Sequence, residues 1–272
     1  MRHLMFRQLL FVEWARLTRR ALLWLALAAV VLYAAYSHQH YYTSNTAQLR
    51  NGDLAMPGFS FDLATPLDHA LLVIQPLLII ITAVLAGSDY SQRTNLHWLM
   101  RVSRPTSLLA KFALLALVTV LTYALTLGIG GGIGWYFKNY IFQNFSLENV
   151  NWAATAAAPF YMSLVTLPYL AFALLITIAT RSTFAGIVIG LGYTQFMEIL
   201  LTGLFYGAGW AQWLMRNLYF SATYLLNSIG NRVVETPARL LEPSPAFAVA
   251  VVYTALFLAL AIRLYNRQDV GG

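Results

Sequence analysis

Long uncharged runs alternate with short polar segments along the whole chain. Six of these runs are long enough to cross, as helices, the roughly 30 Å hydrocarbon core of a bilayer. They lie at residues 21–37, 70–87, 108–135, 156–180, 184–206 and 246–265. The pattern predicts an all-α polytopic membrane protein, with one transmembrane domain across residues 1–272.

Residues 1–20 have the spacing of a partly amphipathic helix. An apolar stripe lies beside a charged one, and the two comprise Phe6, Leu10, Trp14 and Leu17, and then Glu13, Arg16 and Arg20. We interpret this segment as an interfacial helix on the membrane surface. A basic flank of the first span is the alternative.

The connecting segments differ in polarity. Residues 38–69 are polar with aromatic edges, and we expect a loop there. Residues 207–245 are too apolar for a free loop and too short for another hairpin, so one or two re-entrant or interfacial helices are expected. The third span ends in a glycine run that favours close helix approach or local unwinding: Gly128, Gly130, Gly131, Gly132 and Gly134.

The composition supports a membrane protein. Hydrophobic residues make up 59% of the chain and charged residues only 10%, whereas soluble domains average about 25% charged residues. The net charge of +7 is explained by basic flanks facing anionic lipid, so we expect no nucleic acid partner. The lack of Cys excludes disulfides, thiolate catalysis and Cys-ligated metals.

The distribution of Lys and Arg predicts the orientation. Most of the 17 basic residues flank one side of the predicted spans. The exceptions are Arg50, Lys138, Arg216, Arg232 and Arg239. The positive-inside rule then places both termini, the segment 87–111 and the short turn 181–183 in the cytosol.

The polar segment 87–111 predicts a short helix over residues 88–105, parallel to the membrane. Leu96, Leu99 and Met100 share one helical face. Arg104 precedes Pro105, so this helix should end there, and Pro105 should open the helix of the third span. A lipid-bound linker helix is the alternative interpretation.

The same segment carries a family resemblance. Its pattern is Asp89-Tyr90-x-x-x-Thr94, then Leu99, Val102-Ser103-Arg104 and Leu108-Leu109-Ala110-Lys111. This resembles bacterial ABC-transporter permeases of the type-2 exporter class, although Asp89 stands where Glu is usual and Arg93 where Gly is usual. In that family the segment is a coupling helix that docks on the nucleotide-binding subunit.

The resemblance implies a set of partner-coupling residues, to which the turn at Arg181 adds a smaller contact. The set is Asp89, Arg93, Thr94, Leu96, Leu99, Met100, Arg101, Ser103, Arg104 and Arg181. It also implies a permease in the bacterial cytoplasmic membrane, paired with a second permease copy or a paralogue. The cargo would be hydrophobic or amphipathic: a lipid, a peptide or an antibiotic.

The chain lacks the motifs of several enzyme classes. It contains no Walker A pattern, so ATP and Mg²⁺ are expected on separate subunits and no cofactor on this chain. No zinc-protease or hydrolase motif occurs, and His38 and His40 lack matched ligands, so we expect neither a catalytic residue nor a metal site. An integral membrane enzyme is therefore the least favoured class.

Glu198 is the one acid within an apolar run. Ionisable residues at such depth are costly and mark candidate transport residues. Pairing with a neighbour such as Arg216 is the alternative. A stand-alone secondary transporter or channel remains the main alternative to the exporter, and it would place charged pairs at mid-membrane.

Overall fold

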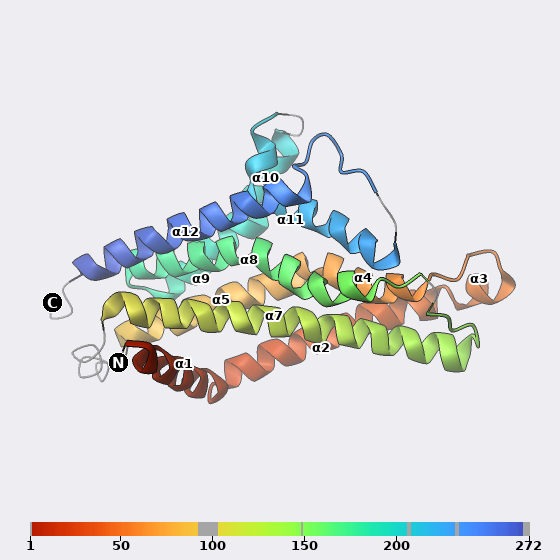
Figure 1. Cartoon of the computed structure of the whole chain (residues 1–272), viewed down its shortest axis with the longest axis horizontal. Coiled ribbons are helices and arrows are strands. Elements are labelled where there is room, and N and C mark those ends of the chain that lie inside the picture. Colours follow the sequence, from red (N-terminus) through yellow and green to blue (C-terminus); the bar gives the residue numbers. More distant parts are fainter. Residues whose placement is uncertain (1, 92–102, 148, 206–207, 232–233, 269–272) are drawn as a thin grey trace.

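The computed structural model describes residues 2–91, 103–147, 149–205, 208–231 and 234–268. The protein is all-α: it is 84% helical, and no strand occurs in those ranges. Figure 1 shows an elongated helical bundle in which the N- and C-termini lie near the same end.

Six helical segments are long and apolar enough to cross a membrane, which confirms the predicted fold class. The first three are α2 (Ala21–Ser44), α5 (Ala70–Ser91), and α7 (Arg104–Tyr136) with the π-turn η2 (Phe137–Ile141). The others are α8 (Trp152–Thr180), then α9 (Thr183–Gly192) with η3 (Tyr193–Met197) and α10 (Glu198–Leu204), and finally α12 (Pro243–Arg267).

The expectation of a loop over residues 38–69 is wrong, because most of this segment is helical. No Gly or Pro interrupts the chain between residues 21 and 51, and α2 continues to Ser44, whose hydroxyl donates to the carbonyl of His40 at 2.6 Å. Gly52 then ends the next helix with a φ of 79°. The two short helices of this segment are α3 (Thr46–Asn51) and α4 (Phe59–Asp68).

The glycine run of α7 lets α4 approach closely, as the sequence predicts. A Cβ at Gly134 would overlap the side chain of Asp62, and one at Gly130 would overlap the Asp62 carbonyl oxygen. Gly128 and Gly132 have nothing within 4 Å of the same position, so they face away from α4. A Cβ at Gly131 would meet Leu63 of α4, so Gly130, Gly131 and Gly134 together form the contact.

The predicted N-terminal helix is present as α1 (Arg2–Thr18). Its buried face differs from the predicted stripe, because it comprises Leu9, Glu13 and Leu17 while Trp14 is exposed. These residues follow i, i+4, i+8 spacing on the face that packs on α7. Packing against a second helix therefore selects a stripe that includes a buried carboxylate.

The segment between α10 and α12 folds into short helices, as expected for residues 207–245. They are η4 (Ala211–Trp213), α11 (Met215–Thr223) and η5 (Tyr224–Gly230). α11 packs on α8 and α12 and buries Leu218, Tyr219 and Ala222. The Tyr219 hydroxyl donates to the carbonyl of Leu67 at 3.0 Å and so joins α11 to the end of α4.

The core of the bundle lies around α8. This helix is the most buried of the six spans, and it contacts α5, α7, α9, α11 and α12. α12 is the least buried, followed by α9–α10 and α2. These three spans therefore carry the largest apolar faces left for lipid or for another chain.

The α4–α7 contact yields a matched pair of substitutions. Gly134→Ala should lower the free energy of unfolding by about 1–3 kcal/mol, because the new methyl group overlaps Asp62. Gly132→Ala should leave it unchanged or slightly raised, because that site is open. Thermal unfolding in detergent measures both variants, and equal melting temperatures would contradict the packing.

Candidate functional site

The two ends of the bundle carry different groups of polar residues. We call the end that holds α1, the start of α7, the α8–α9 turn and the last turn of α12 the terminal end, and the opposite one the far end (Figure 1). Of the predicted coupling set, Asp89 lies in the last turn of α5, Ser103 and Arg104 begin α7, and Arg181 ends α8. The members outside the described residues are Arg93, Thr94, Leu96, Leu99, Met100 and Arg101.

Arg104 joins α7 to the C-terminal end of α12. Its Nη1 donates to the carbonyls of Tyr265 at 3.1 Å and Gln268 at 2.5 Å, a favourable place for a cation. The Gln268 side chain accepts from the Tyr90 hydroxyl at 2.8 Å and donates to the carbonyl of Ile178 at 2.6 Å. The ends of α5, α7, α8 and α12 are therefore tied together.

A buried ion pair joins α1 to α7 at the same end. Lys111 Nζ lies 3.9 Å from Glu13 Oε1, and Arg16 Nη1 donates to that oxygen at 3.2 Å. Lys111 and Glu13 are both buried, and Glu13 Oε2 has no hydrogen-bond partner among the residues that the structure describes. A buried carboxylate requires compensation. Arg16 supplies part of it from within α1, and Lys111 supplies it from α7, so the Lys111–Glu13 pair holds α1 against the start of the third span.

Two members of the predicted coupling set lie exposed at the terminal end. Ser103 precedes the first turn of α7, which contains Pro105 as the sequence predicts. Arg181 adopts a left-handed conformation with a φ of 53° and closes α8 through its N–H to Ile178. The structure thus brings Ser103, Arg104 and Arg181 to one end, and Arg104 is already engaged within the chain.

The far end contains a buried cluster centred on Asp62. Lys138 forms an ion pair with Oδ2, while the Tyr42 hydroxyl and His38 Nε2 donate to Oδ1 at 2.6 and 2.9 Å. All four side chains are buried, and Lys138 Nζ also lies 5.8 Å from the ring centre of Phe59. In the described part of the chain, no group of three or more His, Asp or Glu is placed to hold a metal ion.

Sequence reasoning missed this cluster because it assigned Asp62 to a loop. The available signal was the glycine run followed by Lys138 on an otherwise weakly basic side of the chain. A basic residue directly after a helix-packing motif suggests that it faces a partner helix rather than water. A helix over residues 59–68 would then have presented Asp62 to it.

Glu198 caps the N-terminus of α11. Its carboxylate is fully buried and accepts from the Arg216 backbone N–H at 3.1 Å and from the Tyr169 hydroxyl at 3.0 Å. α11 has Leu214 at its N-cap and thus no side-chain cap of its own, so Glu198 supplies the missing acceptor. Arg216, which the sequence offered as an alternative partner of Glu198, contacts the carboxylate through its backbone N–H.

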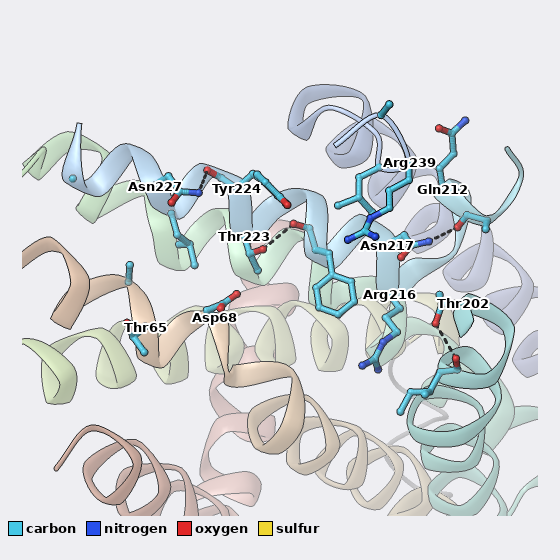
Figure 2. Close-up of a pocket in the computed structure, with 18 of the residues that line it drawn as sticks. Thr65, Asp68, Thr202, Gln212, Arg216, Asn217, Thr223, Tyr224, Asn227 and Arg239 are labelled. Atoms are coloured by element: carbon cyan, nitrogen blue, oxygen red, sulfur yellow. Dashed lines mark hydrogen bonds between the residues drawn. The ribbon is translucent and has the colours of Figure 1, made fainter. Parts of the chain in front are cut away.

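A cavity of about 990 Å³ lies between α4, α10 and the α11 segment. We call it the α4–α11 cavity. Figure 2 shows Thr65 and Asp68 on the α4 wall, with Arg216 and Arg239 across from them. Desolvation against this wall raises the pKa of Asp68 although its carboxylate keeps access to solvent, and neighbouring His69 acts in the opposite direction.

These features define a polytopic α-helical integral membrane protein with six candidate spans. The chain belongs to the family described as "Protein of unknown function (DUF2705)", which it matches over residues 25–271. The match begins within α2 and extends past α12, so α1 lies before it. No curated protein and no solved structure matches the chain.

The Asp62–Lys138 pair leads to a stability prediction. Asp62→Asn should lower the free energy of unfolding by about 3–5 kcal/mol, because it leaves the Lys138 charge buried without a counter-charge. Asp53→Asn is the matched control, since Asp53 is exposed. Thermal unfolding measures both variants.

A double variant isolates the cause. Asp62→Asn combined with Lys138→Met removes both charges and should recover a large part of the lost stability. If the double variant were as unstable as Asp62→Asn alone, the uncompensated lysine would not be the cause.

Proposed function

We propose that this chain is the membrane-spanning permease subunit of an ATP-binding cassette exporter. It forms the substrate path, while separate subunits bind ATP and Mg²⁺ and hydrolyse the nucleotide, so the chain itself is not an enzyme. The observation that carries the proposal is the terminal end, where the segment between α5 and α7 connects spans whose ends are tied together.

The hydrogen bonds that join the helix ends at the terminal end provide a path for transmitting a displacement. A partner that pushes on the segment between α5 and α7 displaces the start of α7, and Arg104 passes this displacement to α12. Gln268 extends it to α5 and α8, and the Lys111–Glu13 pair extends it to α1. A bundle linked in this way responds as a unit to closure of the partner, as a two-state transporter requires.

The proposal includes an orientation. Both termini lie in the cytosol of a bacterial cytoplasmic membrane, because most Lys and Arg residues flank the terminal end. The segment between α5 and α7 and the exposed Arg181 then face a cytosolic ATPase together. The far end, with the α4–α11 cavity, faces outward.

A complete exporter needs a second permease, either another copy of this chain or a paralogue. The weakly buried spans α12, α9–α10 and α2 offer apolar surface both for that contact and for lipid. The cargo in this proposal is hydrophobic or amphipathic and passes along the interface of the two permeases.

The buried Asp62–Lys138 pair favours a second candidate, a stand-alone secondary transporter or channel. Such proteins place coupling charges near the bilayer midplane. Lys138 instead lies near the end of the span Arg104–Ile141, and Glu198 lies in the last helix of the span Thr183–Leu204. Charged residues toward the ends of the spans are better explained as groups that hold helices together than as an ion pathway. The exporter therefore remains the preferred function.

Affinity purification of the tagged chain from its own host tests the coupling. The wild-type chain should co-purify an ATPase that carries a Walker A motif. Leu99→Asp or Arg101→Glu should reduce this recovery about ten-fold or more, because each change disrupts the proposed docking helix.

Arg50→Glu is the matched control, because Arg50 is exposed on α3 at the far end. It should leave ATPase recovery unchanged. Unaltered recovery with Leu99→Asp and Arg101→Glu would refute the coupling segment, and the absence of any ATPase from the wild-type preparation would refute the exporter.

Glu198 offers a second test. Glu198→Gln keeps one side-chain oxygen for the Arg216 N–H, so the chain should still insert and fold. Its loss of charge should reduce transport-coupled ATPase activity of the reconstituted complex several-fold, with membrane levels unchanged. Full activity would remove Glu198 from the candidate transport residues and leave it as the cap of α11.

A further inference from the structure

Hydroxyl and carboxamide side chains from α4, η4, α11 and η5 line the α4–α11 cavity (Figure 2). They include Thr65, Gln212, Asn217, Tyr224 and Asn227. Polar groups that leave water need new partners, so a lining of this kind suits a ligand that itself carries several hydrogen-bonding groups.

Two charged residues of the lining have opposite sign and are not paired with each other. Asp68 ends α4, and Arg216 lies in the first turn of α11 (Figure 2). Within the described ranges, no ion pair joins the two side chains. A zwitterionic ligand would place an ammonium group beside the carboxylate and a carboxylate beside the guanidinium.

Asp68 provides an acceptor that is partly removed from water. Desolvation against the cavity wall raises the pKa of its carboxyl group, and neighbouring His69 acts in the opposite direction. A carboxylate in this setting gains more from a nearby cation than a fully solvated one does. The ammonium group of a ligand would supply that cation.

Arg216 provides donors at its own side of the cavity. Its backbone N–H donates to Glu198 at 3.1 Å, and its guanidinium lies 5.2 Å from the ring centre of Phe220. The Glu198 charge attracts the guanidinium, but the oxygens of this carboxylate accept from the backbone N–H and the Tyr169 hydroxyl. The N–H groups of the guanidinium therefore suit a ligand carboxylate in bidentate geometry.

Two carboxamides are oriented so that their oxygens remain as acceptors. Asn217 donates from Nδ2 to the carbonyl of Ala211 at 2.7 Å, and Asn227 donates from Nδ2 to the carbonyl of Tyr224 at 3.1 Å (Figure 2). Because a carbonyl accepts only from the amide nitrogen, these bonds fix which way each carboxamide points. Neither side-chain oxygen accepts from a residue that the structure describes. The backbone N–H groups of a peptide are donors of the matching kind.

We propose that the α4–α11 cavity binds a short linear peptide, whose free amino terminus faces Asp68 and whose free carboxylate faces Arg216. The side-chain oxygens of Asn217 and Asn227 accept from its backbone N–H groups. A volume of about 990 Å³ lies at the upper end of the range of cavities that enclose drug-sized ligands. This inference rests on the exporter proposal and deepens it, because it selects the peptide among the cargo classes and places it at the far end.

Ligand-dependent thermal unfolding tests the proposal on the purified full chain in neutral maltoside micelles. The probe is tetra-alanine, compared with its N-acetyl, C-amide and doubly blocked forms. Tetra-alanine should raise the melting temperature saturably. Each single block should weaken the apparent affinity about ten-fold, because each removes a charge-assisted contact.

Two variants assign each end of the peptide to one residue. In Asp68→Asn, N-acetylation should have no further effect, whereas C-amidation should still weaken binding. In Arg216→Gln the pattern should be reversed, and the backbone bond to Glu198 is kept. A general loss of stability cannot produce such selective coupling. Asp53→Asn and Arg50→Gln are the matched controls, since both residues are exposed outside the cavity lining, and they should behave like the wild type.

Tetra-alanine that leaves the melting temperature unchanged would overturn the site. The same would follow from blocking effects in Asp68→Asn and Arg216→Gln that equal those in the wild type. Free alanine that binds as tightly as tetra-alanine would overturn the peptide in favour of a single amino acid.

The assay requires no ATPase, so its outcome is independent of the coupling experiment. Peptide binding with this charge pattern by a chain that recruits no ATPase would refute the exporter and preserve the site. Recruitment of an ATPase by a chain that binds none of the peptides would do the reverse.

Discussion

The far end of the bundle depends on keeping Asp62 and Lys138 together. Removing either ion from water costs several kcal/mol, so the pair is tolerable only with close geometry and additional donors. Tyr42 and His38 supply those donors from α2, and Gly130 and Gly134 give α4 the room to bring Asp62 to α7. The ion pair therefore requires α2, α4 and α7 to be in their observed positions.

Buried charges are compensated by different kinds of contact at the two ends of the bundle. At the terminal end, Arg104 binds backbone carbonyls at the end of α12, and Lys111 shares Glu13 with Arg16. These contacts connect helices that would otherwise be held only by apolar packing, which is weak between helices in lipid. A displacement applied at that end would consequently move spans together, whereas the far end keeps its charges within a fixed cluster and one open cavity.

The apolar periodicity of the chain was sufficient to predict the class and the six candidate spans, because crossing a bilayer leaves few alternatives to long helices. It failed where tertiary contacts override local polarity. From local polarity, His38 and Tyr42 are assigned to a loop, because their partner Asp62 lies far along the chain. Glu13 is assigned to a charged face for the same reason, because its partner Lys111 is distant in sequence. The capping of α11 by Glu198 also depends on residues distant in sequence, so periodicity cannot predict it.

The sequence separations within the Asp62 cluster bear on the order in which the protein is made. His38 precedes Asp62 by 24 residues, but Lys138 follows it by 76. During synthesis the carboxylate therefore emerges long before the lysine that neutralises it. Until the third span is inserted, the carboxylate has Tyr42 and His38 as cluster partners but lacks its counter-charge. The Asp62 cluster, which joins α2, α4 and α7, is thus complete only once residue 138 is in place.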